Sequence, residues 1–303
     1  MPVLRIILSL ILISTQAGVY TVENEQRVFL TPEIQYSDDI PIRVNEQNIG
    51  VEITAEKYVA IDVDTGLVLI ENQAQLKQPI ASITKLMTAM VILDLRPNWN
   101  KTVVMTAGDE TSGAYPHLYR GEEVTFFHLW KAALISSDNN AILAMVRSLG
   151  VSETDFVIMM NDKAKQLKLY NTKFADPTGL DPANVSTATD VAKMVYAALQ
   201  HNEIRESVLQ SEYSFDILNN EKKRRIVNTD ILLESFLNSE QFGYELIGGK
   251  TGFLPEAGYC LAVEIKYEDK SVMFVALNSD TITDRFQDTK VLADWVFKNY
   301  LWK

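Results

Sequence analysis

The chain has 303 residues, 47% apolar and 22% charged, so it can bury a large core and has the composition of a soluble globular protein. Its 28 lysines and arginines against 40 aspartates and glutamates give a net charge of -12, which argues against nucleic acid or an anionic membrane surface as the main partner. Cys260 is the single cysteine, so an intramolecular disulfide is excluded, and its apolar neighbours favour a buried structural thiol.

The first residues have the pattern of a secretory signal peptide. Residues 1–5 carry one positive charge, residues 6–13 are apolar except for one serine, and residues 15–17 (Thr-Gln-Ala) suit cleavage after Ala17. The apolar run is shorter than the roughly 20 residues that a transmembrane helix needs. We therefore expect residues 1–17 to be removed and the protein to be exported, to the periplasm or the outside of the cell. The alternative is a buried N-terminal strand or helix.

Next comes an arm, and then two strands. Residues 18–50 are polar and acidic with two prolines and no sustained period, so we expect a polar linker or loosely packed arm. Residues 58–63 and 67–70 are apolar runs separated by Asp64-Thr65-Gly66, which predicts a strand, a glycine turn and a strand.

The segment from residue 81 to 93 predicts a central helix, because it is apolar on nearly every face. Ser82 and Lys85 are three residues apart, so a helix places both side chains on one face. A serine hydroxyl needs a base to become a nucleophile, and a lysine can be that base if burial or another cation lowers its pKa. This is the only S-x-x-K in the chain. Taken alone, it also fits a helix that starts with serine and carries one exposed lysine.

The rest of the chain alternates predicted helices and strands. Residues 124–150 are expected to be helical with a polar break at 136–140, and 153–169 and 190–200 have helical apolar spacing around a proline and glycine loop at 174–182. Strands follow the basic run 222–225, with a hairpin over 258–278 and a terminal helix over 291–300. This order predicts an α+β fold, an antiparallel sheet flanked by helices with an inserted, mostly helical lobe.

Two further motifs complete a set of reactive groups. Ser137-Asp138-Asn139 alone is a common helix cap, and Lys250-Thr251-Gly252 alone is a lysine at a glycine-rich strand end. Together with Ser82 they make an acyl-transfer site. The hydroxyl of Ser137 relays a proton, Asn139 holds a substrate amide, and Lys250 lowers the pKa of Lys85 and attracts a substrate carboxylate. Thr251 donates to that carboxylate, while the neighbouring glycines let a substrate backbone lie along the strand edge.

The order S-x-x-K, S-x-N, K-T-G resembles the serine penicillin-binding proteins and β-lactamases. Within that group the chain resembles the low-molecular-weight D-alanyl-D-alanine carboxypeptidases of bacterial cell-wall metabolism, over residues 51–303. The likeness is carried by residues 81–88, 137–141, 176–181 and 249–261.

This resemblance implies a β-lactamase/transpeptidase-like fold and a serine D,D-carboxypeptidase that removes the terminal D-alanine of peptidoglycan stem peptides. It implies no cofactor and no metal, and β-lactam antibiotics as covalent inhibitors. Ser82 would be the acylated nucleophile, Lys85 its base and Ser137 the third catalytic residue. The substrate-binding residues would be Asn139, Lys250, Thr251, Gly252, Phe253 and Arg285. The peptide N–H groups of Ser82 and Phe253 would form the oxyanion hole. Arg285 would help hold the substrate carboxylate. The alternative interpretation is that Arg285 is a surface arginine without a role in the site.

The chain departs from the family pattern in two places. Asn140 stands where the family often has aspartate, and we expect it to weaken a capping or structural contact. Longer members add a C-terminal β-domain and an amphipathic membrane anchor, which we do not expect here. That resembles shorter members, some of which cut D,D cross-links, so a D,D-endopeptidase remains an alternative.

Three other functions were weighed. A β-lactamase with a literal S-D-N deacylates through a glutamate on a loop between the second and third motifs, and residues 154–202 contain no glutamate. A histidine-dependent serine hydrolase is disfavoured because this chain contains no G-x-S-x-G, the motif that would position the serine of a catalytic triad. A non-catalytic cell-wall binding protein is disfavoured because every reactive residue is present.

Overall fold

The computed structural model describes residues 30, 40–44, 48, 50–111 and 116–302. The expected signal peptide, residues 1–17, lies outside the described residues, as does most of the expected arm. The described parts of that arm are more closely attached than the prediction of a loose arm implies. Leu30 is buried in the core, and the short strand β1 (Ile42–Arg43) pairs antiparallel with β13 (Tyr300–Leu301) at the C-terminal end of the chain.

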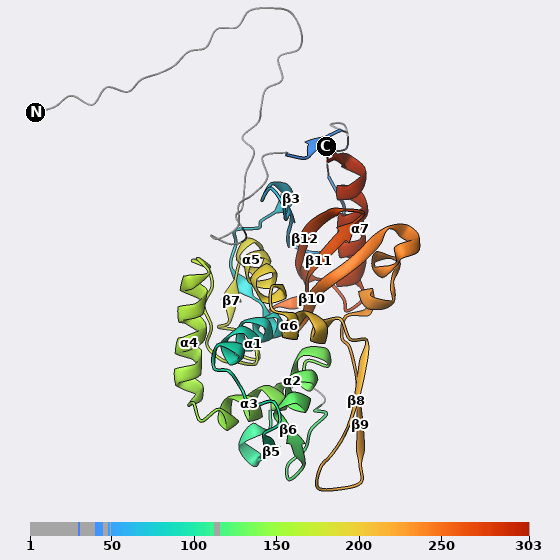
Figure 1. The fold of residues 1–303 in the computed structure, drawn as a ribbon. Coiled ribbons are helices and arrows are strands. Elements are labelled where there is room, and N and C mark those ends of the chain that lie inside the picture. The colour runs from blue at the N-terminus through green and yellow to red at the C-terminus, as the bar shows by residue number, and fades with distance from the viewer. Residues whose placement is uncertain (1–29, 31–39, 45–47, 49, 112–115, 303) are drawn as a thin grey trace, which may run out of the picture.

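The centre of the molecule is a five-stranded antiparallel sheet of order β10-β11-β12-β2-β3 (Figure 1). Its strands are β10 (Tyr244–Leu254), β11 (Gly258–Tyr267), β12 (Lys270–Ser279), β2 (Lys57–Asp62) and β3 (Val68–Asn72). The predicted hairpins around residues 64–66 and 268–270 are confirmed. In the first of them, the carboxylate of Asp62 accepts hydrogen bonds from the backbone N–H and hydroxyl of Thr65, and Gly66 adopts φ +70°.

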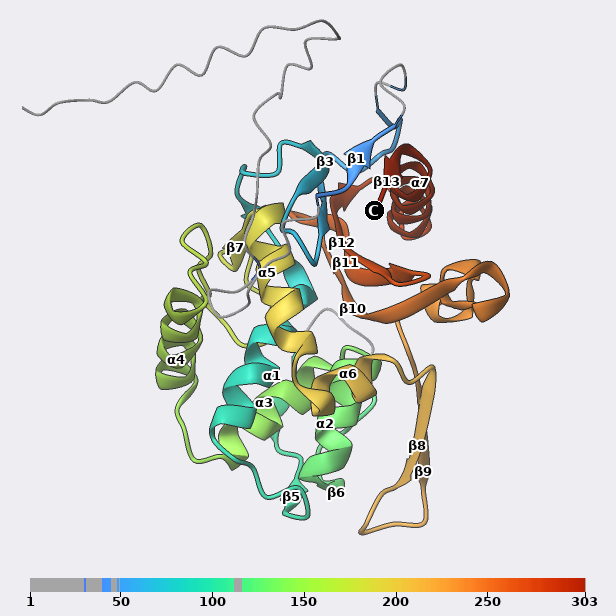
Figure 2. The same cartoon turned by 45° about the horizontal axis from the view of Figure 1, so that its top comes forward.

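The two faces of the sheet are both buried, and alternate residues of each strand face different cores. On β11, Cys260 and Ala262 join the core shared with the helical lobe, whereas Leu261 and Val263 join the core under the terminal helix α7 (Asp284–Asn299). Burial on both faces explains why these strands read as continuous apolar runs in the sequence. Figure 2 shows α7 on one side of the sheet and α5 (Ala188–Leu199) on the other.

The lobe inserted between β3 and β10 is mostly helical, as predicted. Besides α5 it contains α1 (Thr84–Asp94), α2 (Phe126–Ile135), α3 (Asn139–Ser148), α4 (Glu153–Gln166) and α6 (Asn202–Val208). Helix α1 is buried over Thr84–Ile92, which confirms the predicted central helix. Helix α5 contacts both α1 and the sheet, so it joins the lobe to the strands.

Shorter elements connect these parts. Three further strand pairs are β4 (Gln78–Pro79) with β7 (Val185–Ser186), β5 (Thr102–Val104) with β6 (Glu123–Thr125), and β8 (Glu212–Asp216) with β9 (Lys223–Val227). The 3-10 turns are η1 (Ala81–Ile83), η2 (Ala107–Asp109), η3 (Ile231–Glu234), η4 (Phe236–Asn238) and η5 (Glu240–Phe242).

The main boundary that the sequence misplaced is the start of the terminal helix. We expected it at residue 291, and it begins at Asp284. Its first turns bury polar residues, which hides the apolar period. The carboxylate of Asp288, for example, accepts hydrogen bonds from the hydroxyls of Thr54 and of Ser279, the last residue of β12. Burial of a carboxylate with this many partners is a tertiary feature that a hydrophobic pattern does not reveal.

Candidate active site

Ser82 lies in the 3-10 turn η1, one turn before α1, and its side chain is half-buried. Lys85 lies in the first turn of α1 and is fully buried. The spacing predicted that the two side chains share a face, and Nζ of Lys85 is 2.8 Å from Oγ of Ser82. Both groups are therefore within direct proton-transfer distance.

Three groups surround Nζ of Lys85. Besides Oγ of Ser82, they are the side-chain oxygen of Asn139 at 2.6 Å and the backbone oxygen of Thr178 at 2.7 Å. A neutral amine has two N–H groups and one lone pair. Its two N–H groups can donate to the two carbonyl oxygens, and its lone pair can accept from the serine hydroxyl. In the structure Nζ donates to all three oxygens, which fits the charged form, and turning the Ser82 contact around accommodates the neutral form that a base requires.

The pKa of Lys85 is correspondingly low. Burial lowers it from 10.5 to about 7, while the carboxylates of Asp176 and Asp138 oppose part of that fall. The sequence analysis expected the charge of Lys250 to help lower the pKa of Lys85. The structure instead makes burial the main cause, because α1 places the amine inside the protein away from water.

The backbone partner of Lys85 comes from the proline and glycine loop at 174–182, for which the sequence predicted no role in the site. In this loop the carboxylate of Asp176 accepts hydrogen bonds from the N–H groups of Thr178 and Gly179. Gly179 has φ +87°, and a Cβ there would lie 2.1 Å from the carbonyl oxygen of Ala81. Glycine therefore lets the loop pack directly against the Ser82 turn, which is what brings the Thr178 carbonyl to Lys85.

The second motif occupies the connection between α2 and α3. Asp138 caps α3 by accepting from the N–H of Ala141, so the capping interpretation of this residue is right. Its neighbours face the site at the same time. Ser137 adopts φ 62°, an uncommon conformation for a residue other than glycine, and its hydroxyl is 3.0 Å from Nζ of Lys250, while Asn139 reaches Lys85.

The expected weakening at Asn140 stays a prediction, since the structure shows the side chain with hydrogen-bond partners at both its oxygen and its nitrogen. Its side-chain oxygen accepts hydrogen bonds from the backbone N–H and the hydroxyl of Thr111, and its amide donates to the carbonyl of Leu118. An amide can donate and accept at once, so Asn140 bonds both the donors of Thr111 and the carbonyl of Leu118. An ionised carboxylate could bond only the donors.

The third motif lies on β10, the edge strand of the sheet. Lys250 is buried beside Ser137, and its pKa lies well below 10.5 because of burial first and then repulsion by Lys85 and Arg285. Gly252 packs against the Ser82 turn, where a Cβ would lie 2.9 Å from the carbonyl oxygen of Ile80. Phe253 follows with an exposed ring stacked on Tyr259. The edge strand and the Ser82 turn are therefore in direct contact.

Arg285, expected either at the site or on the surface, is buried against the third motif. Its guanidinium donates to the carbonyl of Gly252 at 3.1 Å and lies over the rings of Tyr259 and Phe286. The start of α7 at Asp284 is what turns this side chain toward β10.

Two residues beside the third motif were missed by the sequence analysis. The hydroxyl of Thr229 is 2.6 Å from the hydroxyl of Thr251. Asp230 is buried, and burial raises its pKa to about 6 although the Leu232 N–H and the charges of Arg285 and Lys250 oppose the rise. No catalytic motif marks either residue, because their contacts with the site, such as that of Thr229 with Thr251, join parts of the chain that are distant in sequence.

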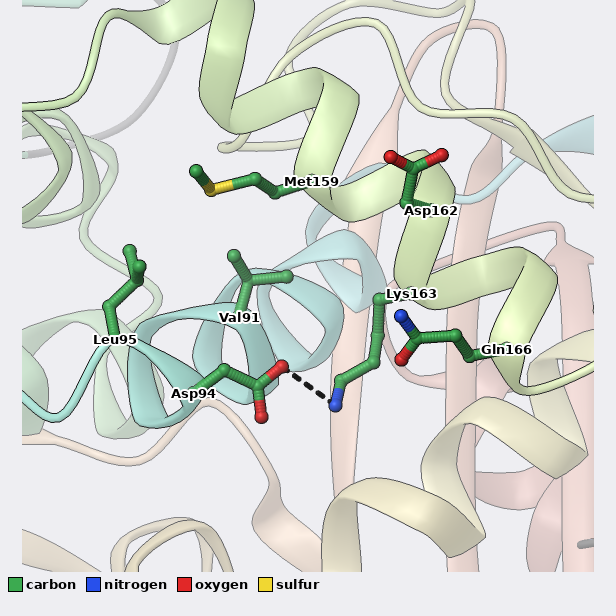
Figure 3. Close-up of a pocket in the computed structure, with 7 residues that line it drawn as sticks. All are labelled: Val91, Asp94, Leu95, Met159, Asp162, Lys163 and Gln166. Atoms are coloured by element: carbon green, nitrogen blue, oxygen red, sulfur yellow. Dashed lines mark ion pairs between the residues drawn. The ribbon is translucent and has the colours of Figure 1, made fainter.

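A groove elsewhere in the lobe has no part in this constellation. It lies between the C-terminal end of α1 and α4, has a volume of about 200 Å³, and contains the ion pair of Asp94 and Lys163 (Figure 3). Ser82 stands before the opposite end of α1, an 11-residue helix about 16 Å long. Within the described residues, no group of three His, Cys, Asp or Glu side chains is placed to hold a metal ion.

Comparison with known proteins identifies the family. Residues 43–281 match the family model described as D-alanyl-D-alanine carboxypeptidase. The chain belongs to the D-alanyl-D-alanine carboxypeptidase family. It is therefore an enzyme of the serine-peptidase type, a hydrolase.

Relatives within and near the D-alanyl-D-alanine carboxypeptidase family fall into two functional groups. The chain is 32% identical to the D-alanyl-D-alanine endopeptidase of Escherichia coli over 81% of its length and 78% of the relative. It is also 32% identical to the D-alanyl-D-alanine carboxypeptidase DacF of Bacillus subtilis, over 81% of its length but 63% of the relative.

Solved structures confirm the predicted fold class. The Streptomyces K15 DD-transpeptidase superposes with a TM-score of 0.74 at 27% identity, covering 82% of this chain and 98% of that one. Penicillin-binding protein D2 from Listeria monocytogenes, in its cefotaxime-bound form, superposes with a TM-score of 0.70 at 28% identity, covering 82% and 99%.

Proposed function

We propose that this protein is a serine D,D-carboxypeptidase that removes the terminal D-alanine of peptidoglycan stem peptides through an acyl-enzyme on Ser82. The observation that carries the proposal is the contact between Ser82 and a buried Lys85 whose surroundings suit a neutral amine. Residues 51–303 form the catalytic domain, which is supported by the family match over 43–281.

In acylation, Lys85 takes the hydroxyl proton of Ser82 as Oγ attacks the carbonyl carbon of the penultimate residue. The N–H groups of Ser82 and Phe253 hold the developing oxyanion; the contact of Gly252 with the Ser82 turn supports this placement. The C–N bond then breaks, and the proton passes from Lys85 through the Ser137 hydroxyl to the leaving amine. In deacylation a water molecule gives its proton to the same base and attacks the ester, which frees Ser82.

The free carboxylate of the substrate binds between Lys250, Thr251 and Arg285. Lys250 and Thr251 are neighbours on β10, and the guanidinium of Arg285 reaches the next residue, Gly252, from α7. Both basic side chains are buried, and the carboxylate of Asp230 interacts with each of them. A carboxylate brought into such a site gains charge-assisted hydrogen bonds. Asn139 holds the substrate amide next to Lys85. β-Lactams, which carry a carboxylate beside a strained amide, enter the same site and acylate Ser82.

Digestion of defined substrates tests the activity. The protein should release free D-alanine from a pentapeptide ending in D-Ala-D-Ala, measured by chromatography of the products. A second candidate, D,D-endopeptidase, is favoured by the relatives with that name, of which this chain spans 78% to 80%. If the protein cleaves a cross-linked dimer and leaves the pentapeptide intact, it is an endopeptidase. Cleavage of neither substrate would contradict both activities.

The protein acts outside the cytoplasm, where peptidoglycan lies. The relatives are cell-wall enzymes, and the signal pattern over residues 1–17 supports export with cleavage after Ala17. Among the residues that the structure describes, no helix has the length and apolar character of a membrane span. N-terminal sequencing of the exported protein should begin at Gly18; retention of Met1 would indicate an uncleaved N-terminal anchor.

Replacing Lys250 with glutamine should separate substrates with a free carboxylate from those without one. Loss of a charge-assisted hydrogen bond costs about 2 kcal/mol, so kcat/KM for the pentapeptide should fall about 30-fold. An ester without a free carboxylate should lose much less. Lys163→Gln, in the distant groove, is the matched control and should leave both values unchanged. Equal losses for the two substrates would place Lys250 on the proton path alone.

A further inference from the structure

Thr229 touches the third motif without belonging to any recognised one. Its side-chain oxygen lies 2.6 Å from that of Thr251, and either hydroxyl could be the donor of this hydrogen bond. Thr251 is buried on β10, 22 residues further along the chain. The segment that carries Thr229 joins the end of β9 to the 3-10 turn η3.

The backbone around Thr229 is held from several sides. Its own N–H donates to the carbonyl of Ile135, the last residue of α2 and two residues before Ser137. The side-chain amide of Asn228 donates to the carbonyls of Val208 and Gln210. Asp230 accepts from the N–H of Leu232. The hydroxyl of Thr229 is therefore fixed relative to both the second and the third motif.

The direction of the Thr229–Thr251 hydrogen bond follows from the chemistry of the substrate. A hydroxyl has one proton to donate, and a carboxylate only accepts. If Thr251 donated to Thr229, it would present a lone pair to the substrate carboxylate, which is repulsive. If Thr229 donates to Thr251, the proton of Thr251 is free to point at the carboxylate. Only the second arrangement serves anion binding.

We propose that Thr229 is a positioning residue for substrate recognition: it donates its hydroxyl proton to Thr251 and so turns the Thr251 O–H toward the substrate carboxylate. This inference rests on the proposed function, in which Thr251 binds that carboxylate. Thr229 touches no reacting atom and acts only through Thr251. Its contribution therefore concerns substrates that carry a free carboxylate, and it appears in KM more than in kcat.

The test compares Thr229→Val, which keeps the shape and removes the hydroxyl, with Thr229→Ser, which keeps the hydroxyl. For the pentapeptide, Thr229→Val should raise KM by about 10-fold, the scale of one lost hydrogen bond, and Thr229→Ser should restore it. Acylation by an ester without a free carboxylate should change by no more than about twofold, because that substrate has no carboxylate for the Thr251 O–H to bind. Thr172→Val, which removes a similar hydroxyl pair with Ser186, is the control and should affect neither substrate.

A double-mutant cycle separates this inference from the proposed function. In a Thr251→Val background, Thr229→Val should cause no further loss for the pentapeptide. If Thr251→Val itself leaves the preference for a free carboxylate intact, the proposed role of Thr251 fails. If Thr251→Val removes the preference for substrates with a free carboxylate, and Thr229→Val leaves that preference unchanged, only the role of Thr229 is overturned. Equal losses for both substrates in Thr229→Val that Thr229→Ser does not restore would also overturn the role of Thr229. If Thr229→Val does not fold, Thr229→Ala replaces it.

Discussion

Ser82→Ala is expected to abolish both peptide hydrolysis and covalent labelling by a penicillin-type probe. Loss of a serine nucleophile costs about 10⁶-fold in kcat in another serine peptidase, so the residual rate should fall below detection. The physical reason is that alanine leaves Lys85 with no hydroxyl to deprotonate, because within the described residues Ser82 has the one hydroxyl that is hydrogen-bonded to its amine. The fold should persist, because the Ser82 side chain is half-buried and caps no helix.

The measurement is mass spectrometry of the intact protein after incubation with the probe, with thermal unfolding recorded for each variant. Ser136→Ala is the matched control, since it removes a nearby hydroxyl that bonds the carbonyl of Ala132 and leaves Ser82 in place. It should still be labelled. A covalent adduct on Ser82→Ala at any residue of this site would show that the nucleophile has been assigned wrongly.

Replacing Lys85 with methionine should reduce the rate of Ser82 acylation by about 10³-fold, within the range for loss of a general base. Methionine fills a similar volume with an apolar chain, so the buried site gains no unpaired charge. The carbonyl of Thr178 and the amide of Asn139 lose a donor, which we expect to lower the melting temperature slightly. Lys163→Met, at the surface groove, should retain full activity.

The pH profile of the same reaction identifies Lys85 as the base. A lysine accepts a proton only when neutral, so the acylation rate should rise with pH as Lys85 loses its proton. Because burial lowers the pKa of Lys85 to about 7, the rise should be half complete near pH 7 and level above it. A neutral ester is the substrate of choice, since it has no carboxylate that titrates or binds Lys250. The rise should disappear in Lys85→Met.

A rising limb centred near 10.5 in the wild-type enzyme would contradict this assignment, because it would mean that Lys85 keeps its ordinary pKa. A limb near 7 that survives in Lys85→Met would assign the titration to another group. Asp230 is the alternative whose raised pKa, about 6, lies close to 7. In that case Asp230→Asn would remove the rise of the acylation rate with pH.

Local features of the sequence were enough to predict the class of fold and to propose the reactive residues. Ser82 and Lys85 are three residues apart in the continuous helical segment formed by η1 and α1, so their contact depends on local helical geometry. The antiparallel hairpins follow from apolar runs separated by tight turns, and the break before Asn139 follows from a capping sequence. These are short-range effects, and the structure contains each of them.

The properties that would make the site work depend on contacts between distant parts of the chain. The amine of Lys85 meets the carbonyl of Thr178 across 93 residues, and Lys250 meets Ser137 across 113. Burial within the protein is the largest cause of the low pKa of Lys85, and the repulsion between the two lysines acts mainly on Lys250. The contact of Thr229 with Thr251 has no sequence signature, because the hydroxyl pair forms only when the segment after β9 packs against β10. Spacing along the chain thus selects which residues can share a face, whereas burial and long-range packing decide their protonation and their partners.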